Sequence, residues 1–196
     1  MLTILFDLSD VLIKGLEGTE EPLAVYLGLP KDKVFSDLFD FDYHQFWLGK
    51  ISENEVIKQL IKKNKWQISP DKLRKIIYGN FREIKGTRKL ILDLKKRYKL
   101  ILLSVNPPEW AVYFEKNFSY RNLFNYIHYS YEIGYTKREP ESYLYIMERH
   151  HLNPNEIVLI DDSTRNINIA KSVGIDGIKF LSSSQIKKEL IARKVI

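Results

Sequence analysis

Short apolar runs alternate along this chain with segments in which apolar positions recur every three or four residues. A short apolar run is typical of a buried strand, and a spacing of three or four is typical of one helix face. Because the two patterns alternate, we predict βαβ units that build an α/β core, a Rossmann-like parallel sheet between two helical layers. The runs expected to form strands are residues 2–6, 99–103, 126–130, 157–160 and 177–180.

One long segment interrupts this alternation, because residues 15–84 contain helix patterns but no convincing strand. Within it, Ser52 and Glu55 have the spacing of a capping box, in which each side chain bonds the backbone amide of the other residue. Apolar residues at helical spacing follow this box. We therefore predict an α/β core of residues 1–14 and 85–196, with an all-helical cap of residues 15–84 over the carboxyl edge of the sheet.

Three of the predicted strands end in side chains that carry oxygen. Asp7 follows the first strand, Ser104 follows the second, and the adjacent acids Asp161 and Asp162 follow a later one. The carboxyl ends of parallel strands meet at one edge of the sheet, where ligands of such sheets bind. Lys137 lies in a loop between a strand and a helix. Together these side chains predict a site for a hard cation and an anion, which suits magnesium-assisted phosphoryl transfer.

Each of these residues suits a separate part of that chemistry. Asp7 can attack phosphorus to form an aspartyl-phosphate, and Lys137 can neutralise charge on the transferring group. Ser104 can donate a hydrogen bond to a phosphate oxygen, while a divalent cation relieves the repulsion between Asp161 and Asp162. Each also has a structural interpretation, as a turn residue, a solvated lysine or an acid at a helix start. The functional interpretation therefore depends on their joint occurrence in this order.

Composition narrows the class of protein. The chain has 196 residues, of which 44% are hydrophobic and 29% charged, as in soluble globular proteins. No apolar run reaches the roughly 20 residues of a membrane span, and the first residues do not resemble a secretory signal, so we expect a cytoplasmic protein without membrane contact. The net charge of +6 is dispersed over helical faces, so we expect no nucleic-acid partner. Cysteine is absent, which excludes thiolate chemistry, and the sequence leaves the oligomeric state unknown.

Three stretches of the chain resemble the haloacid-dehalogenase-like hydrolase superfamily, in a form with a helical cap after the first motif. They are residues 6–12, 134–143 and 160–163. The resemblance covers nearly the full length of the chain. It implies catalytic roles for Asp7 as the nucleophile, for Ser104 as a phosphate binder and for Lys137 as the lysine of the third motif.

The resemblance also implies which residues hold the cofactor and the substrate, a small phosphorylated metabolite. The expected Mg2+ ligands are Asp7, Asp161, Asp162 and, through its backbone carbonyl, Ser9. Residues 46–52 resemble the cap of sugar-phosphate phosphatases in this superfamily, including bacterial glucose-1-phosphatases. The residues expected to contact phosphate or substrate are Leu8, Ser9, Asn106, Trp47 and His44. The alternative for Phe46 and Trp47 is that they only pack the interior of the cap.

The chain departs from the superfamily pattern at Ser9. Most of these phosphatases carry there a second aspartate, which protonates the leaving oxygen and then activates water. Losing such a group costs on the order of a hundred- to ten-thousand-fold in rate. We therefore predict a slow or leaving-group-selective hydrolase of small phosphate monoesters or acyl phosphates. Asp10, one residue later, is an alternative source of the proton if the local backbone changes.

Two other functions stay open from the sequence. If turnover has been lost, the same fold would serve as a non-catalytic domain that binds phosphate or a partner. A haloacid dehalogenase also lacks the second aspartate, but its chemistry uses no metal. The adjacent acids Asp161 and Asp162 therefore argue against dehalogenation.

Overall fold

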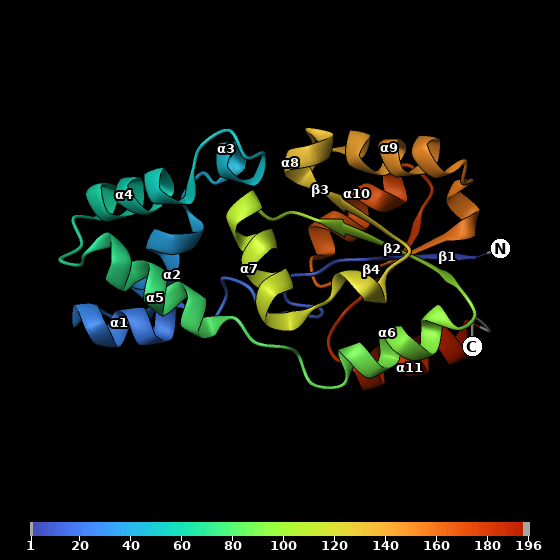
Figure 1. The fold of residues 1–196 in the computed structure, drawn as a ribbon, viewed down its shortest axis with the longest axis horizontal. Coiled ribbons are helices and arrows are strands. Elements are labelled where there is room, and N and C mark those ends of the chain that lie inside the picture. The colour runs from blue at the N-terminus through green and yellow to red at the C-terminus, as the bar shows by residue number, and fades with distance from the viewer. Residues whose placement is uncertain (1, 194–196) are drawn as a thin grey trace.

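The computed structural model describes residues 2–193, and the strands of this part form one parallel sheet in the order β3-β2-β1-β4-β5 (Figure 1). The strands are β1 (Thr3–Phe6), β2 (Lys99–Ser104), β3 (Tyr126–Tyr129), β4 (Ile157–Asp161) and β5 (Asp176–Lys179). The predicted α/β class with a parallel sheet is confirmed, although β5 begins one residue before the predicted range. Among the described residues, no helix combines the length and apolar character that crossing a bilayer requires.

The register of the two central strands brings the predicted acids to the same level. Phe6 of β1 pairs with Ile160 of β4, so Asp7 and Asp161 follow at neighbouring positions. The amide of Asp7 donates to the carbonyl of Ile160 at 3.0 Å, which continues the ladder by one residue. On the other side Phe6 pairs with Leu102, so β2 ends at the same edge of the sheet. Ordinary parallel pairing therefore gathers the candidate site.

Alternate residues of each central strand enter different hydrophobic layers. Ile4 and Phe6 pack in one layer and Leu5 packs in the other, as the two-residue period of a strand requires. Helices α6 (Thr87–Lys95), α7 (Pro108–Phe118) and α11 (Ser183–Ala192) cover the first face. Helices α9 (Pro140–His150) and α10 (Thr164–Ser172) cover the second (Figure 1). Both faces of the sheet are buried, which explains the nearly continuous apolar strand sequences.

The segment between β1 and α6 is helical, as predicted. Its helices are α1 (Glu20–Leu27), α2 (Lys31–Phe39), α3 (His44–Trp47), α4 (Glu53–Asn64) and α5 (Pro70–Asn80). The capping box forms at the start of α4, where Ser52 accepts from the Glu55 amide and Glu55 accepts from the Ser52 amide at 2.8 Å. Figure 1 shows these helices beyond the carboxyl ends of the strands. We call this helical segment the cap.

The chain enters and leaves the cap through two paired segments. Ile13 and Glu83 form an antiparallel bridge. The amide of Lys14 donates to the carbonyl of Arg82 at 2.8 Å, and the amide of Ile84 donates to Leu12 at 2.8 Å. The predicted boundaries at residues 15 and 84 stay a prediction, but both lie beside this pairing.

A buried carboxylate links the cap to the core. Glu53 at the start of α4 is buried, and its carboxylate accepts from the indole of Trp110 on α7 at 2.8 Å. It also accepts from the guanidinium of Arg74 on α5 at 2.8 Å. The Glu53 amide in turn donates to the carboxylate of Glu109 at 3.0 Å. Because the buried charge is both paired and hydrogen-bonded, this contact holds α4 and α5 to the core.

Three short helical elements were not predicted from the sequence. These are α8 (Ser130–Ile133), η1 (Arg121–Leu123) and η2 (Pro154–Glu156). The run expected to be a strand at 126–130 stops at Tyr129, because Ser130 already begins α8. A single helical turn shows no periodicity, so only local capping marks it.

Two histidines pair at the edge of the sheet, away from the strand ends. The Nε2 atoms of His128 on β3 and His150 on α9 lie 2.8 Å apart. Tyr126 packs against the His150 ring with centroids 4.5 Å apart. Burial lowers the pKa of His128 to about 4, helped by the neighbouring His150 and Arg149. Burial also lowers the pKa of His150.

This pair predicts a loss of stability in mild acid. A lowered pKa in the folded state means that the unfolded chain binds the proton first, near pH 6.5. The free energy of unfolding should therefore decline as pH falls from 7 towards 4, with a contribution on the order of 1 kcal/mol after solvent screening. Urea denaturation of His128→Gln should show a weaker decline than wild type. Lys171→Met, which changes an exposed side chain outside the histidine pair, is the control; equal pH dependence in all three proteins would contradict the prediction.

Candidate functional site

A buried lysine joins two strand-end acids. The Nζ atom of Lys137 lies 2.7 Å from Oδ1 of Asp7 and 2.5 Å from Oδ2 of Asp161. Lys137 is 2% exposed and Asp161 is fully buried. Burial alone would lower the pKa of Lys137, but Asp161 and Asp7 outweigh it and raise that pKa, so the ammonium stays charged. The structure thus brings together residues from β1, β4 and the loop before α9.

Local hydrogen bonds fix the loop that carries Lys137. Gly134 ends α8 with a φ of 80°, in the left-handed region that glycine adopts easily. The carboxylate of Glu139 then accepts from the amide of Thr136 at 2.8 Å and from its hydroxyl at 2.9 Å. This Thr-x-x-Glu turn closes around Lys137 and directs its side chain towards the strand ends.

The start of α10 holds Asp161. Its Oδ1 accepts from the amide of Ser163 at 2.8 Å and from the side-chain amide of Asn166 at 3.0 Å. Ser163 caps the helix by accepting from the Asn166 amide. The helix-capping explanation of the acidic pair is therefore partly correct for this stretch, but the cap itself is Ser163. Asp161 is left facing Lys137.

Three carboxylates converge at one point. Asp7, Asp161 and Asp162 each offer an oxygen, and these atoms all lie within 4.8 Å of one another. Burial raises the pKa of Asp7 well above its usual range against the opposing effect of Lys137. Burial likewise raises the pKa of Asp162 to about 6. Three acids beside one ammonium leave excess negative charge, so the donor set fits a divalent cation with oxygen ligands.

The predicted phosphate-binding residues form a connected group beside Asp7. The side-chain amide of Asn106 donates to the Ser104 hydroxyl at 2.6 Å, and both residues are buried. The Ser9 hydroxyl donates to the Asn106 side-chain oxygen at 3.2 Å. The Leu8 amide donates to Oδ1 of Asp7 at 2.6 Å. The side chains of Ser9, Asn106 and Ser104 are thus hydrogen-bonded in series, and the Leu8 amide contacts the carboxylate of Asp7 directly.

Asp10 is engaged elsewhere. Its backbone is left-handed, with a φ of 57°. Its carboxylate lies 2.7 Å from Nζ of Lys14 and accepts from the Gly15 amide at 3.3 Å. The alternative in which Asp10 supplies the missing proton would require these contacts to break.

Two adjoining cavities open between the cap and the strand ends. The one beside Asp7 has a volume of about 220 Å3, and its lining includes Ser9, His44, Trp47 and Lys137. The second, of about 270 Å3, is lined by Asp10, Asp162 and a set of aromatic residues. Its aromatic residues are Phe39, Phe41, Tyr43, Trp47 and Trp110. Of the cap residues considered from the sequence, His44 and Trp47 reach the first cavity, while Phe46 is buried in the packing.

Sequence reasoning assigned no site role to Thr136, Arg138 or Asn166, which also line the first cavity. The Thr-x-x-Glu spacing before Pro140 could have indicated the turn at Thr136. Asn166 lies three residues after a capping serine at a strand end, a position that can bond the preceding acid. No local sequence pattern marks Arg138 as a residue that lines the cavity.

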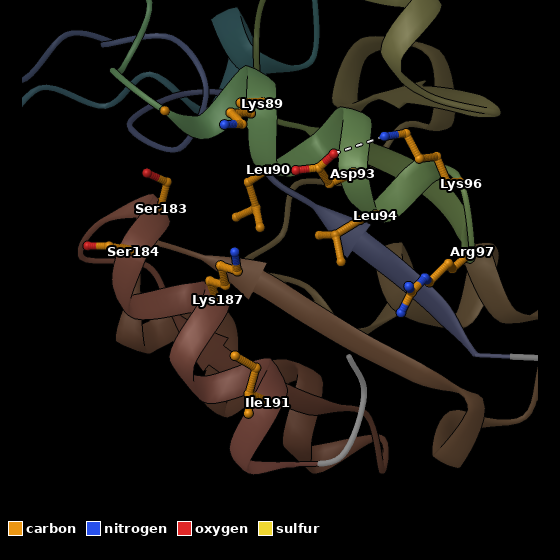
Figure 2. A pocket seen from close by; sticks show the side chains of 11 residues that line it. Lys89, Leu90, Asp93, Leu94, Lys96, Arg97, Ser183, Ser184, Lys187 and Ile191 are labelled. Carbon is orange, nitrogen blue, oxygen red and sulfur yellow. Dashed lines mark hydrogen bonds and ion pairs between the residues drawn. The ribbon is translucent and has the colours of Figure 1, made fainter.

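A larger hollow lies on the other side of the molecule, between α6 and α11 (Figure 2). Its volume is about 550 Å3, and Leu90, Leu94 and Ile191 point into it among lysines. The acid of this hollow, Asp93, is paired with Lys96 at 3.1 Å. It has no group of carboxylates comparable to that at Asp7, so we place the functional site at the strand ends.

The protein is of the α/β class: it has a parallel sheet, an intervening helical cap and lysine-bridged acids at the strand ends that could hold a metal ion. Residues 4–180 match the haloacid dehalogenase-like hydrolase family, and the chain belongs to it. The resemblance found in the sequence is thus confirmed.

Named relatives and solved structures cover nearly the whole chain. It is 28% identical over 201 residues to D-ribitol-5-phosphate phosphatase of Bacteroides thetaiotaomicron, covering 95% of each protein. It is 24% identical over 187 residues to phosphorylated carbohydrates phosphatase of Thermotoga maritima, covering 91% of this chain and 84% of that protein. A Bacteroides thetaiotaomicron enzyme of the family, solved with magnesium and inorganic phosphate, shares the fold with a TM-score of 0.74 at 24% identity, covering 93% of this chain and 95% of the other.

Removing the bridging ammonium should destabilise the protein. In Lys137→Met the carboxylates of Asp7 and Asp161 stay buried without their cation, so the free energy of unfolding should fall by about 3–5 kcal/mol in EDTA. Urea denaturation measures this loss. The exposed Lys171→Met on α10 is the control and should change it by less than about 0.5 kcal/mol. Equally small losses for both variants would show that Lys137 does not stabilise the two acids.

Proposed function

We propose that this chain is a magnesium-dependent phosphatase of small phosphate monoesters or acyl phosphates that works through an aspartyl-phosphate. The observation that carries the proposal is the buried contact of Lys137 with Asp7 and Asp161, next to Asp162. The names of the two relatives add support and favour a phosphorylated carbohydrate as the substrate. Cavities of about 220 and 270 Å3 suit a molecule of that size.

The residues divide the reaction between them. An oxygen of Asp7 attacks phosphorus while the bond to the leaving oxygen breaks, and water later releases the phosphate from the aspartyl-phosphate. Lys137 offsets negative charge on Asp7 and on the phosphoryl oxygens. Ser104 and Asn106, which are hydrogen-bonded to each other, are the side chains proposed to donate to those oxygens. Mg2+, held by Asp7, Asp161 and Asp162 with the Ser9 carbonyl as a further expected ligand, would supply charge stabilisation for the phosphoryl group.

The hydroxyl at Ser9 makes the proposed enzyme sensitive to its leaving group. An alkoxide leaves poorly without a proton, whereas an acyl or anomeric phosphate needs less help. Ser9 is hydrogen-bonded to Asn106, and serine is a weak acid, so it does not replace a carboxylic acid. We therefore expect slow hydrolysis of alkyl phosphates and faster hydrolysis of acyl phosphates.

Two other functions remain as alternatives with less support. A non-catalytic phosphate-binding domain would keep the cation site without turnover. Haloacid dehalogenation uses no metal ion, so it would not explain why the carboxylates of Asp7, Asp161 and Asp162 converge. Phosphate release from a panel of phosphate esters and acyl phosphates separates the first alternative from the enzyme, and chloride release from 2-haloacids in EDTA tests the second.

The nucleophile and the metal should both be required. Asp7→Asn removes the attacking oxygen, so kcat should fall by at least about a thousand-fold in a phosphate-release assay. EDTA should abolish turnover by wild type, and added Mg2+ should restore it. Asp32→Asn on α2, an exposed acid, is the control and should retain full activity. Turnover that survives Asp7→Asn or persists in EDTA would rule out the proposed mechanism.

Restoring an acid at Ser9 should widen the range of substrates. In Ser9→Asp the new carboxyl can protonate the leaving oxygen, so kcat for alkyl phosphates should rise about a hundredfold or more. Hydrolysis of acetyl phosphate should change by less than about threefold, because its leaving group needs little protonation. Ser9→Ala is the control for loss of the hydroxyl alone. A similar gain on both classes of substrate would show that the missing proton is not the limiting element.

A further inference from the structure

The cavity beside Asp7 contains only four ionisable side chains among the residues that the structure describes. They are Asp7, Lys137, Arg138 and His44. Asp7 is the proposed nucleophile, and Lys137 is held between two carboxylates. An arginine keeps its proton in proteins. His44 is therefore the remaining group, and an imidazole ring can both donate and accept a proton.

We propose that His44 is the general acid and base of this enzyme, a slower substitute for the aspartate that the superfamily usually carries at the position of Ser9. This inference rests on the proposed phosphatase function. It assigns the cap a catalytic residue, in addition to its expected part in substrate selection. The charged groups that share the cavity with His44 are Asp7, Lys137 and Arg138, and Asp42 precedes it in the chain.

The proton transfers balance over the two steps. In the first, Asp7 attacks phosphorus, the bond to the leaving oxygen breaks, and that oxygen takes its proton from the His44 imidazolium. The products are the aspartyl-phosphate, the free alcohol and a neutral imidazole. In the second, the imidazole takes a proton from water as the water oxygen attacks phosphorus. The bond to Asp7 then breaks, which returns the carboxylate, inorganic phosphate and the imidazolium.

The cap element that carries His44 is attached to the core. The carboxylate of Asp42 accepts from the His44 amide at 2.9 Å and so fixes the start of α3. At the other end of α3, the Trp47 carbonyl accepts from the hydroxyl of Ser130, the first residue of α8. Figure 1 shows α3 next to α8. His44 is thereby held over the cavity that contains Asp7 and Ser9.

Close backbone packing reinforces this attachment. Gly49 follows α3 with a φ of 66°, and a Cβ there would lie 3.0 Å from Cβ of Tyr131 and 3.4 Å from the ring of Pro108. Only glycine allows this approach without a shift of the core. The two core residues belong to α8 and α7, so the segment that carries His44 contacts both of these elements.

The other nearby groups are already engaged. The carboxylate of Asp10 is bound by Lys14 and Gly15 and lines the adjoining cavity. The hydroxyl of Ser9 is bonded to Asn106. Among the described residues the His44 ring makes no hydrogen bond or ion pair, and His44 lines the same cavity as Asp7. A leaving group that points towards the cap would therefore meet the imidazole.

The leaving group provides the test. We would compare wild type and His44→Gln in single-turnover release of the leaving group, ribitol from D-ribitol 5-phosphate, an alkyl phosphate, and acetate from acetyl phosphate. His44→Gln should lose about a hundredfold in the release of ribitol and less than about threefold in the release of acetate. A purely structural role would lower both rates alike. His151→Asn, far from the cavity, is the matched histidine control, and urea denaturation should give His44→Gln the stability of wild type.

A second variant makes the inference sharper. Once Ser9→Asp supplies a carboxyl, adding His44→Gln should change kcat on the alkyl phosphate by less than about threefold, because the proton has another source. A loss of equal size in both backgrounds would overturn the role of His44. An unchanged rate in His44→Gln would also overturn the role of His44. If Asp7→Asn is inactive in the same assay, the phosphatase proposal still stands. No turnover of any substrate by wild type would overturn both.

Discussion

The contact of Lys137 with Asp7 and Asp161 is the interaction on which the site depends. Taking charges out of water is costly, and this cost is offset only where opposite charges meet with good geometry. The parallel register places the two acids side by side, and the Thr136–Glu139 turn delivers the ammonium between them. Lys137 supplies one positive charge against the three carboxylates of Asp7, Asp161 and Asp162. The negative charge that remains suits a divalent cation.

Much of this could be predicted, because it follows from local pattern and parallel topology. The apolar runs fix which residues end the strands, and the carboxyl ends of parallel strands share an edge. Asp7, Ser104, Asp161 and Asp162 were therefore expected together before any coordinates. Lys137 was less obvious, since a lone lysine in a loop carries no periodic signal. Its assignment rested on its joint occurrence with the strand-end residues and on the resemblance to a family. The closed turn around it gives the physical reason for its position.

The rest could not be read from the sequence because it arises from contacts between distant segments. The one-turn helix α8 has no periodicity, yet its Ser130 bonds Trp47, 83 residues away. That contact brings His44 over the site. Arg138 lines both of the cavities that lie between the cap and the strand ends. Site residues at the strand ends could thus be predicted from the sequence. The contacts that attach the cap to the core could not.

The antiparallel bridge between Ile13 and Glu83 has a consequence for how such a protein can diversify. The outgoing and returning segments of the chain run side by side, so the helices of the cap are connected to the core through this one paired segment. The cap can therefore gain or lose residues, or change its surface side chains, while the sheet register and its acids stay as they are. New substrate preferences can therefore arise in the appended module without disturbance to the phosphoryl-transfer machinery beneath it.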